Sequence, residues 1–302
     1  MAHDPDNAAL PAAPGALAAL AAGERSRAAA LLAESDDAEH PLLADALREH
    51  LRHGDDHAVY DQPAAFEAFI RSGGNVELYE SVSDRLAETY ARTGAATLLD
   101  IGCGDGLAIV AALVRGRSRV TSVSLVEPSS ALLEQAVARL SAEVPDVEVR
   151  PSLGGVETFL ADSPDEPIDL VESTFALHTL PPAVRDTALR QLARLCGTIA
   201  IAEFDVPEFE RGGPDHVRFL AGTYERGLAE YDDDRHLVAQ GFLMPVLTGQ
   251  LAPGAKRVTW EQPAGQWRTQ VERCGFTDVV VRPLTDYWSS PAFLLTGRGA
   301  FS

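Results

Sequence analysis

The sequence has few cysteines and few positive charges, and both shortages exclude classes of protein. Its three cysteines, Cys103, Cys196 and Cys274, show neither the pairing of a disulfide framework nor the spacing of a zinc knuckle. Lys and Arg number 25 against 45 Asp and Glu, which gives a net charge of −20. A surface of this sign is unsuited to nucleic acid or to an anionic membrane. We therefore expect no nucleic-acid partner and no membrane partner. We also expect no bound metal, because no His/Cys/Asp cluster in the sequence has convincing metal-ligand spacing.

Long apolar runs and lysines are scarce as well. No stretch is long and apolar enough to span a membrane, and the alanine-rich N-terminus lacks the basic residues of a secretion signal. With the cysteine usage, this predicts a cytoplasmic location. Lys256 is the only lysine, and its neighbours are typical of an exposed loop, which disfavours a Schiff-base mechanism. At 302 residues the chain is long enough for one large domain with an appendage.

Helical patterns dominate roughly the first 95 residues. Apolar residues recur there at helical spacing, and Gly73-Gly74-Asn75 is expected to break the helical pattern. The predicted helices are Ala12–Leu32, broken near Gly23, Pro41–His53 and Leu78–Thr93. We interpret residues 1–80 as a helical cap and residues 81–302 as the domain that carries the site.

Strands and helices alternate regularly between residues 97 and 204, which predicts an α/β fold with a doubly wound, mostly parallel sheet. The expected strands are Thr97–Ile101, Val120–Glu127, Val147–Arg150, Ile168–Thr174 and Thr198–Phe204, and the helices between them are Leu107–Val114, Ser130–Glu143, Val156–Ala161 and Pro182–Leu195. Residues 207–263 are predicted to be an insertion over the sheet edge. The last helix and two strands are Gln266–Cys274, Asp278–Arg282 and Phe293–Thr296.

The most informative motif is a glycine-rich turn after the first strand. Asp100 lies near the end of an apolar strand that runs directly into Gly102-Cys103-Gly104-Asp105-Gly106. Glycines permit positive φ and let a ligand approach the backbone, and the following helix N-terminus offers unpaired N–H groups. Glu127 ends the second strand about 20 residues later, where a carboxylate can reach ribose hydroxyls. Two carboxylates and no basic residue suit a cationic nucleoside better than a pyrophosphate.

This combination resembles motif I and the following acidic motif of class I S-adenosylmethionine-dependent methyltransferases. In that family the residue matching Glu127 binds the ribose, and the residue matching Asp100 helps to hold the methionine amino end. The resemblance covers about residues 80–204 and 264–298, and it implies a seven-stranded sheet whose last strand is antiparallel between strands five and six. It implies S-adenosyl-L-methionine as the cofactor, with contacts from Asp100, Gly102, Gly104, Gly106, Glu127, Pro128, Ser152 and Thr174. Ser152 follows strand three, where the family often has an acidic residue beside the adenine.

Candidate catalytic residues lie where strands four and five end, because ligands of open α/β sheets bind at the carboxyl ends of the strands. Strand four runs into the stretch from Phe175 to His178, which resembles an apolar-His sequence of the family. His178 is either a general base or a residue that packs against the following helix. Glu203, at the end of strand five, either binds a substrate amine or accepts a proton, or it is a solvated strand end. The Phe175 ring would stabilise a cation by about 1–2 kcal/mol.

A second aromatic group, formed by Tyr60, Phe66, Phe69 and Tyr79, surrounds the Gly73-Gly74 pair. Aromatic residues at these spacings are typical of a core. The alternative is a lid that closes over the cofactor, with Tyr60 as a candidate catalytic residue and the glycines as a hinge.

We expect an enzyme that methylates a small molecule by in-line attack on the sulfonium methyl group, with S-adenosylhomocysteine as the product. Two alternatives remain. One is a cyclase in which the amino group of the cofactor attacks its own γ-carbon, giving azetidine-2-carboxylate and methylthioadenosine. The other is a non-catalytic S-adenosylmethionine-binding regulator. A dehydrogenase is disfavoured, because the third glycine comes one residue too early for a dinucleotide fingerprint. The expected partners are a small-molecule substrate or S-adenosylmethionine alone, and a homodimer is left open.

Overall fold

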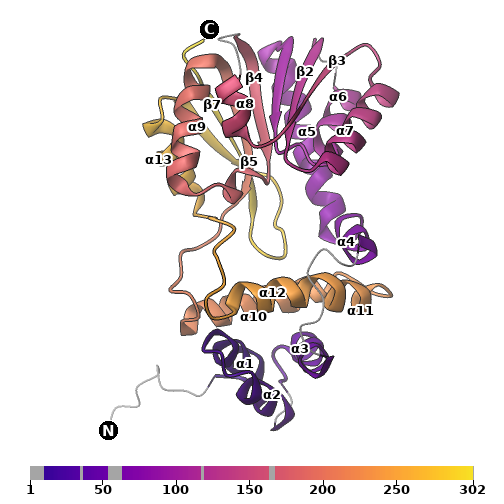
Figure 1. Cartoon of the computed structure of the whole chain (residues 1–302), viewed down its shortest axis with the longest axis vertical. Coiled ribbons are helices and arrows are strands. Elements are labelled where there is room, and N and C mark those ends of the chain that lie inside the picture. Colours follow the sequence, from indigo (N-terminus) through magenta and orange to yellow (C-terminus); the bar gives the residue numbers. More distant parts are fainter. Residues whose placement is uncertain (1–9, 35–36, 54–62, 117–118, 163–166, 302) are drawn as a thin grey trace. The chain divides into compact units, whose positions relative to one another are not determined.

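The computed structural model describes residues 10–34, 37–53, 63–116, 119–162 and 167–301. The chain divides into two compact units (Figure 1). The helical unit comprises the residues up to Val76 together with Glu208–Arg257, and the sheet unit comprises Glu77–Pro207 and the residues from Val258 to the C-terminus. Among the described residues, no helix is both long enough and apolar enough to cross a membrane.

The sheet unit is built on seven strands in the order β3-β2-β1-β4-β5-β7-β6. The pairs from β3 to β5 are parallel, and β7 lies antiparallel between β5 and β6. This arrangement confirms the predicted doubly wound sheet and the inserted antiparallel strand. The strands are β1 (Thr97–Ile101), β2 (Ser122–Glu127), β3 (Glu148–Leu153), β4 (Ile168–Thr174), β5 (Cys196–Phe204), β6 (Thr277–Pro283) and β7 (Ala292–Arg298).

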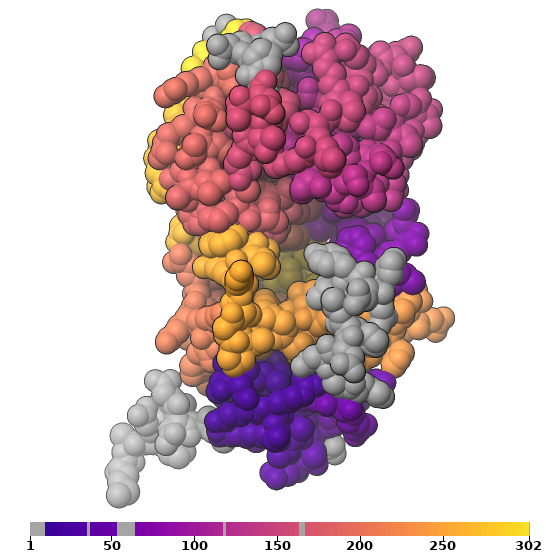
Figure 2. All heavy atoms as spheres, viewed as in Figure 1, coloured from indigo at the N-terminus to yellow at the C-terminus, as the bar shows by residue number. Residues whose placement is uncertain are grey.

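Helices cover both faces of the sheet, and each face has its own apolar core. Successive strand residues point to opposite faces, so Leu98 packs on one core and Leu99 on the other. The first core is covered by α5 (Gly74–Thr93), α6 (Leu107–Arg115) and α7 (Ser130–Glu143). The second is covered by α8 (Val156–Asp162), α9 (Pro182–Leu195) and α13 (Ala264–Arg273), and α8 and α9 are neighbours on the face seen in Figure 2. By this alternation Asp100 shares the face of Leu98.

The helical unit is formed by segments from two distant parts of the sequence. Buried Leu17, Leu43 and Leu247 lie in its interior. The carboxylate of Glu225 accepts hydrogen bonds from the backbone N–H groups of Leu42 and Leu43, at 3.1 and 2.8 Å, and so satisfies the start of α3. The helices are α1 (Ala12–Ala21), α2 (Arg25–Glu34), α3 (Pro41–His53), α4 (Pro63–Ile70), α10 (Pro214–Ala229), α11 (Arg235–Val238), the π-helical turn η3 (Ala239–Leu243) and α12 (Met244–Leu251). The cap role given to residues 1–80 concerns the relation between the units and stays a prediction.

The start of α5 was predicted wrongly. The sequence predicts a helix from Leu78, but α5 begins at Gly74, so the expected break at Gly73-Gly74-Asn75 is shorter. The Gly74 N–H donates to the Glu230 carboxylate at 2.8 Å, and the Asn75 side chain donates to the Phe69 carbonyl at 2.8 Å. These acceptors lie outside α5 and satisfy donors at its N-terminus, which local periodicity does not reveal.

Candidate active site

The glycine turn after β1 is held in a left-handed backbone conformation. Gly102, Gly104 and Gly106 have φ of +71°, +54° and +81°, and the Gly102 N–H donates to the Val126 carbonyl at 2.8 Å. A Cβ on Gly102 would lie 2.3 Å from the Cβ of Ala176, so this glycine is needed for the fold itself. A Cβ on Gly104 would meet no described atom within 4 Å. Gly104 therefore leaves open space against its backbone, as a ligand-binding turn requires.

Glu127 at the end of β2 is fixed against this turn. Its side chain is buried, with one carboxylate oxygen accepting from the Gly104 N–H at 3.1 Å and the other from the Ser129 N–H at 2.9 Å. Each oxygen keeps a further lone pair for another donor. Pro128 follows at the surface, and Ser152 on β3 is half-buried and in register with Val126. The cofactor contacts predicted on the first three strands thus lie together at the carboxyl ends of these parallel strands.

Two carboxyl groups are buried side by side on β1 and β4. Asp100 and Glu172 are register partners and are only 3% and 1% exposed. The Tyr90 hydroxyl of α5 donates to Oε2 of Glu172 at 2.6 Å, whereas Oδ1 of Asp100 and Oε1 of Glu172 have no hydrogen-bond partner among the described residues. Burial, with a smaller contribution from the Glu127 carboxylate, raises the pKa of Asp100 to about 7. Burial and the Asp100 carboxylate raise the pKa of Glu172 well above its ordinary value.

His178 and Glu203 form a pair where β4 and β5 end. His178 lies in the 3₁₀ turn η2 (Leu177–Thr179). Its Nδ1 is 2.8 Å from Oε2 of Glu203, and its backbone N–H donates to Oε1 of the same carboxylate at 3.0 Å. Burial lowers the pKa of His178, but the Glu203 carboxylate and then Glu261 outweigh it, so the net shift is upward. With Nδ1–H donating to Glu203, Nε2 is the nitrogen left to accept a proton.

A row of aromatic rings lies along the ends of the same strands. Phe175 and Phe204 are stacked with centroids 4.5 Å apart, and Phe204 and Tyr287 are stacked at 5.3 Å. The Tyr79 ring meets the Phe175 ring edge-on, with their centroids 6.0 Å apart. The ring centroids of Tyr287 and Trp288 are 5.4 Å apart. Phe175 has φ of +51°, a conformation that costs a non-glycine residue about 1–2 kcal/mol and that is found at functional sites. Thr174, which precedes it, ends β4 and is half-buried.

The second aromatic group predicted from the sequence is divided between the units. Phe66 and Phe69 belong to the helical unit, where their rings pack on Phe242 at 5.5 and 4.4 Å. Tyr79 belongs to the sheet unit and contacts Phe175. Tyr60 lies outside the described residues, so its catalytic role stays a prediction.

The comparisons with known proteins agree with this geometry. Residues 98–198, which include the glycine turn, Glu127 and His178, match the family model of the methyltransferase domain. The match identifies residues 98–198, about a third of the chain, as a methyltransferase domain. This domain was predicted from the glycine turn and the acidic residue after the second strand.

Relatives of the methyltransferase domain support the same assignment. An uncharacterized methyltransferase of Geobacillus kaustophilus is 32% identical over 133 residues, which cover 43% of this chain and 57% of that protein. One of Mycobacterium bovis is 32% identical over 132 residues, covering 43% and 61%. The chain thus spans about three fifths of the length of the curated relatives that it matches.

Two solved structures have the same fold as this chain. Magnesium protoporphyrin IX methyltransferase of Synechocystis, solved with S-adenosylhomocysteine, has a TM-score of 0.51 at 14% identity, covering 80% of this chain and 97% of that chain. Mitomycin 7-O-methyltransferase has a TM-score of 0.50 at 17% identity, covering 95% and 75%. At these identities the likeness concerns the fold alone.

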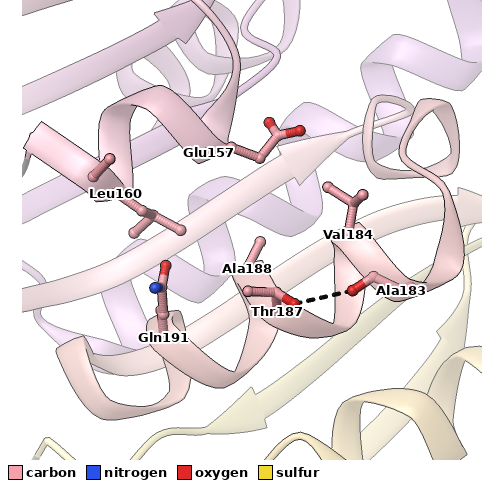
Figure 3. A pocket seen from close by; sticks show the side chains of 8 residues that line it. Glu157, Leu160, Ala183, Val184, Thr187, Ala188 and Gln191 are labelled. Atoms are coloured by element: carbon pink, nitrogen blue, oxygen red, sulfur yellow. Dashed lines mark hydrogen bonds between the residues drawn. The ribbon is translucent and has the colours of Figure 1, made fainter.

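A cavity of about 350 Å³ lies elsewhere on the methyltransferase domain, between α8 and α9 (Figure 3). Leu160, Val184 and Ala188 supply apolar walls, Glu157 contributes a carboxylate from α8, and the Thr187 hydroxyl is turned back to the Ala183 carbonyl at 3.0 Å. None of the cofactor or catalytic residues predicted from the sequence lines this cavity. The predicted site residues lie at the strand ends, apart from the α8–α9 cavity.

Sequence reasoning did not select Glu172, Tyr90 or Phe204 as site residues. One signal for Glu172 was available, because it is acidic within an apolar strand, as Asp100 is. Its pairing with Tyr90 joins residues 82 positions apart and needs the fold.

We expect Glu127→Ala to weaken the binding of S-adenosylmethionine about tenfold or more. Each charge-assisted hydrogen bond from a ribose hydroxyl contributes about 1.5–3 kcal/mol. Isothermal titration calorimetry measures the affinity, and Glu134→Ala on α7, which changes the same charge, is the matched control. An unchanged affinity would show that the Glu127 carboxylate does not contact the ribose.

Proposed function

We propose that this protein transfers the methyl group of S-adenosylmethionine to a hydroxyl group of a small molecule. The observation that carries the proposal is the fixed Glu127 carboxylate, bonded to the N–H of Gly104 beside open space. A carboxylate at the end of this strand suits the ribose of a nucleoside, and the open space against the Gly104 backbone leaves room for that nucleoside. The family match over residues 98–198 supports the same cofactor.

The residues present also fit the charged part of this cofactor. Its sulfonium supplies an electrophilic methyl group, and its amino acid end carries an ammonium group. Oδ1 of Asp100 is buried and without a hydrogen-bond partner among the described residues, so a cationic donor would satisfy it. Tyr79 is half-buried, and desolvation and the nearby Asp105 carboxylate raise the pKa of its phenol to about 12, so the phenol stays neutral and can act as a donor.

The acceptor hydroxyl is inferred from His178 and Glu203. A hydroxyl must lose its proton as it attacks, and a histidine held by a carboxylate is suited to take that proton. Glu203 fixes the ring through Nδ1, which leaves Nε2 as the base. The aromatic row from Phe175 to Tyr287 lies at the same strand ends and suits a flat or apolar acceptor. The printed name of mitomycin 7-O-methyltransferase, a structural neighbour, describes transfer to oxygen.

The pH dependence of methyl transfer should report the His178–Glu203 pair. His178 accepts a proton only when neutral, so the rate should rise with pH through its raised pKa. In Glu203→Gln the largest cause of the upward shift is removed while burial remains, so the midpoint should move to lower pH and the maximal rate should fall. Asp286→Asn, an exposed carboxylate change in the sheet unit, is the control. A midpoint that stays in place in Glu203→Gln would exclude His178 as the titrating base.

Mass spectrometry of the nucleoside product tests the proposal. The protein is incubated with S-adenosylmethionine alone and then with a panel of phenols, alcohols, carboxylic acids and amines. S-adenosylhomocysteine that forms only with a hydroxyl compound is the expected result. Methylthioadenosine from the cofactor alone would establish the cyclase alternative, and cofactor binding without either product throughout the panel would favour the regulator.

A further inference from the structure

The buried carboxyl pair on β1 and β4 has a specific hydrogen-bond pattern. Tyr90 donates to one oxygen of Glu172, which leaves Oε1 as the oxygen able to carry a proton. Oε1 of Glu172 and Oδ1 of Asp100 are the two oxygens without a partner among the described residues, and they belong to register partners on adjacent strands. Both side chains are more than nine-tenths buried. One proton on Oε1 would make that oxygen a donor to one lone pair of Oδ1 and leave the other lone pair for a cationic group.

The charges around the pair are negative. Glu127 faces Asp100 from β2, and the Cys103 thiol of the glycine turn faces Asp100, Glu127 and Asp105. From α5, Tyr90 faces both carboxyls as a neutral phenol whose pKa is raised by burial and by Glu172. On the β5 side, the register partner of Glu172 is Ala200, which has no charge. Arg139 of α7 is paired with Asp105 at 2.9 Å. Two ionised carboxylates side by side in this setting would repel each other strongly.

We propose that Glu172 is a positioning residue that holds a proton and donates it as a hydrogen bond to Asp100, so that a single negative charge on Asp100 receives the ammonium group of the cofactor. The proposal rests on the proposed function, because it concerns the same cofactor. Tyr90 orients Glu172 by occupying its other oxygen. Cofactor binding is then linked to protonation, since a bound cation favours the ionised form of Asp100.

The affinity for the cofactor should rise with pH, because binding requires the ionised form of Asp100. Below about pH 7 Asp100 of the free protein is protonated, so binding must release that proton. At pH 8 Asp100 is already ionised and no proton is released. We therefore expect S-adenosylmethionine to bind about tenfold more weakly at pH 6 than at pH 8.

Titration calorimetry in buffers of different ionisation enthalpy measures this proton directly on the full chain. Close to one proton should be released per bound S-adenosylmethionine or S-adenosylhomocysteine at pH 6, and close to none at pH 8. Methylthioadenosine lacks the amino acid end and should release no proton at either pH. This comparison attributes the proton to the ammonium group and not to the nucleoside.

Variants of Glu172 distinguish whether its side chain acts as a protonated hydrogen-bond donor or as a second negative charge beside Asp100. Glu172→Gln is neutral, still accepts from Tyr90 and still donates to Asp100, so its affinity at pH 8 should stay near that of the wild type. Glu172→Leu cannot donate, so it should bind about tenfold more weakly, with the midpoint of the pH dependence moved to higher pH. Glu157→Gln, a carboxylate of α8 outside the site, is the charge control.

The outcomes are distinguishable. Binding without proton release at pH 6, or a loss in Glu172→Gln as large as in Glu172→Leu, would overturn the inference and leave the proposed function standing. Absence of binding of both S-adenosylmethionine and S-adenosylhomocysteine at every pH would overturn the proposed function. If Glu172→Leu fails to fold, proton release by the wild type and the Glu172→Gln result still decide the question.

Discussion

His178→Ala is expected to bind S-adenosylmethionine normally and to lose methyl transfer to hydroxyl acceptors by about 10²–10⁴-fold, the usual contribution of a general base. The reason is that Nε2 of His178 takes the hydroxyl proton while Nδ1 is held by Glu203 at 2.8 Å. Single-turnover rates with a phenol of high pKa measure the loss. A phenol of low pKa, already ionised at neutral pH, needs no base and should react nearly as fast as with the wild type.

The control for this variant is His236→Ala, which removes an exposed histidine of the helical unit. Thermal unfolding must accompany the kinetics, because His178→Ala leaves the buried Glu203 carboxylate without its imidazole partner. A normal rate in His178→Ala with a lowered melting temperature would contradict the catalytic role and leave His178 as a structural partner of Glu203.

Gly104→Val is expected to abolish measurable binding of S-adenosylmethionine. Gly104 has φ of +54°, and a Cβ at this position meets no described atom within 4 Å, so the new side chain would enter the space left for the ligand. The left-handed conformation costs a non-glycine residue about 1–2 kcal/mol, which a folded domain can tolerate. Calorimetry measures the affinity, and circular dichroism checks that the variant is folded.

Gly102→Ala provides a matched comparison. Its Cβ would lie 2.3 Å from the Cβ of Ala176, so this variant should lose stability in the ligand-free state. Gly104→Val should instead lose affinity with a smaller loss of stability. Wild-type affinity in a folded Gly104→Val variant would show that the cofactor does not pass over this glycine.

Local sequence patterns were sufficient to predict most of the sheet. β1 and β4 begin and end as expected, because short apolar runs are bounded by turn residues on both sides. The start of α5 was missed because the acceptor for the Gly74 N–H is Glu230, 156 positions away. The grouping of residues 208–257 with the N-terminal helices was missed for the same reason, since it depends on long-range packing.

The cofactor side of the site was easier to predict than the catalytic side. The glycine turn and Glu127 are set by the order of strand, turn and helix, which is visible in the sequence. His178 and Glu203 were named separately, but their contact spans 25 positions and arises only because β4 and β5 are neighbours. Glu172 and Tyr90 meet across the interface between α5 and the sheet, and no spacing rule connects them.

The most direct test of the central claim is a crystal structure of this protein with S-adenosylhomocysteine. The account predicts that the ribose hydroxyls donate to the Glu127 carboxylate, that the nucleoside passes over Gly104, and that the ammonium group lies against Asp100. A nucleoside bound away from the turn at residues 102–106, for example in the cavity between α8 and α9, would contradict it.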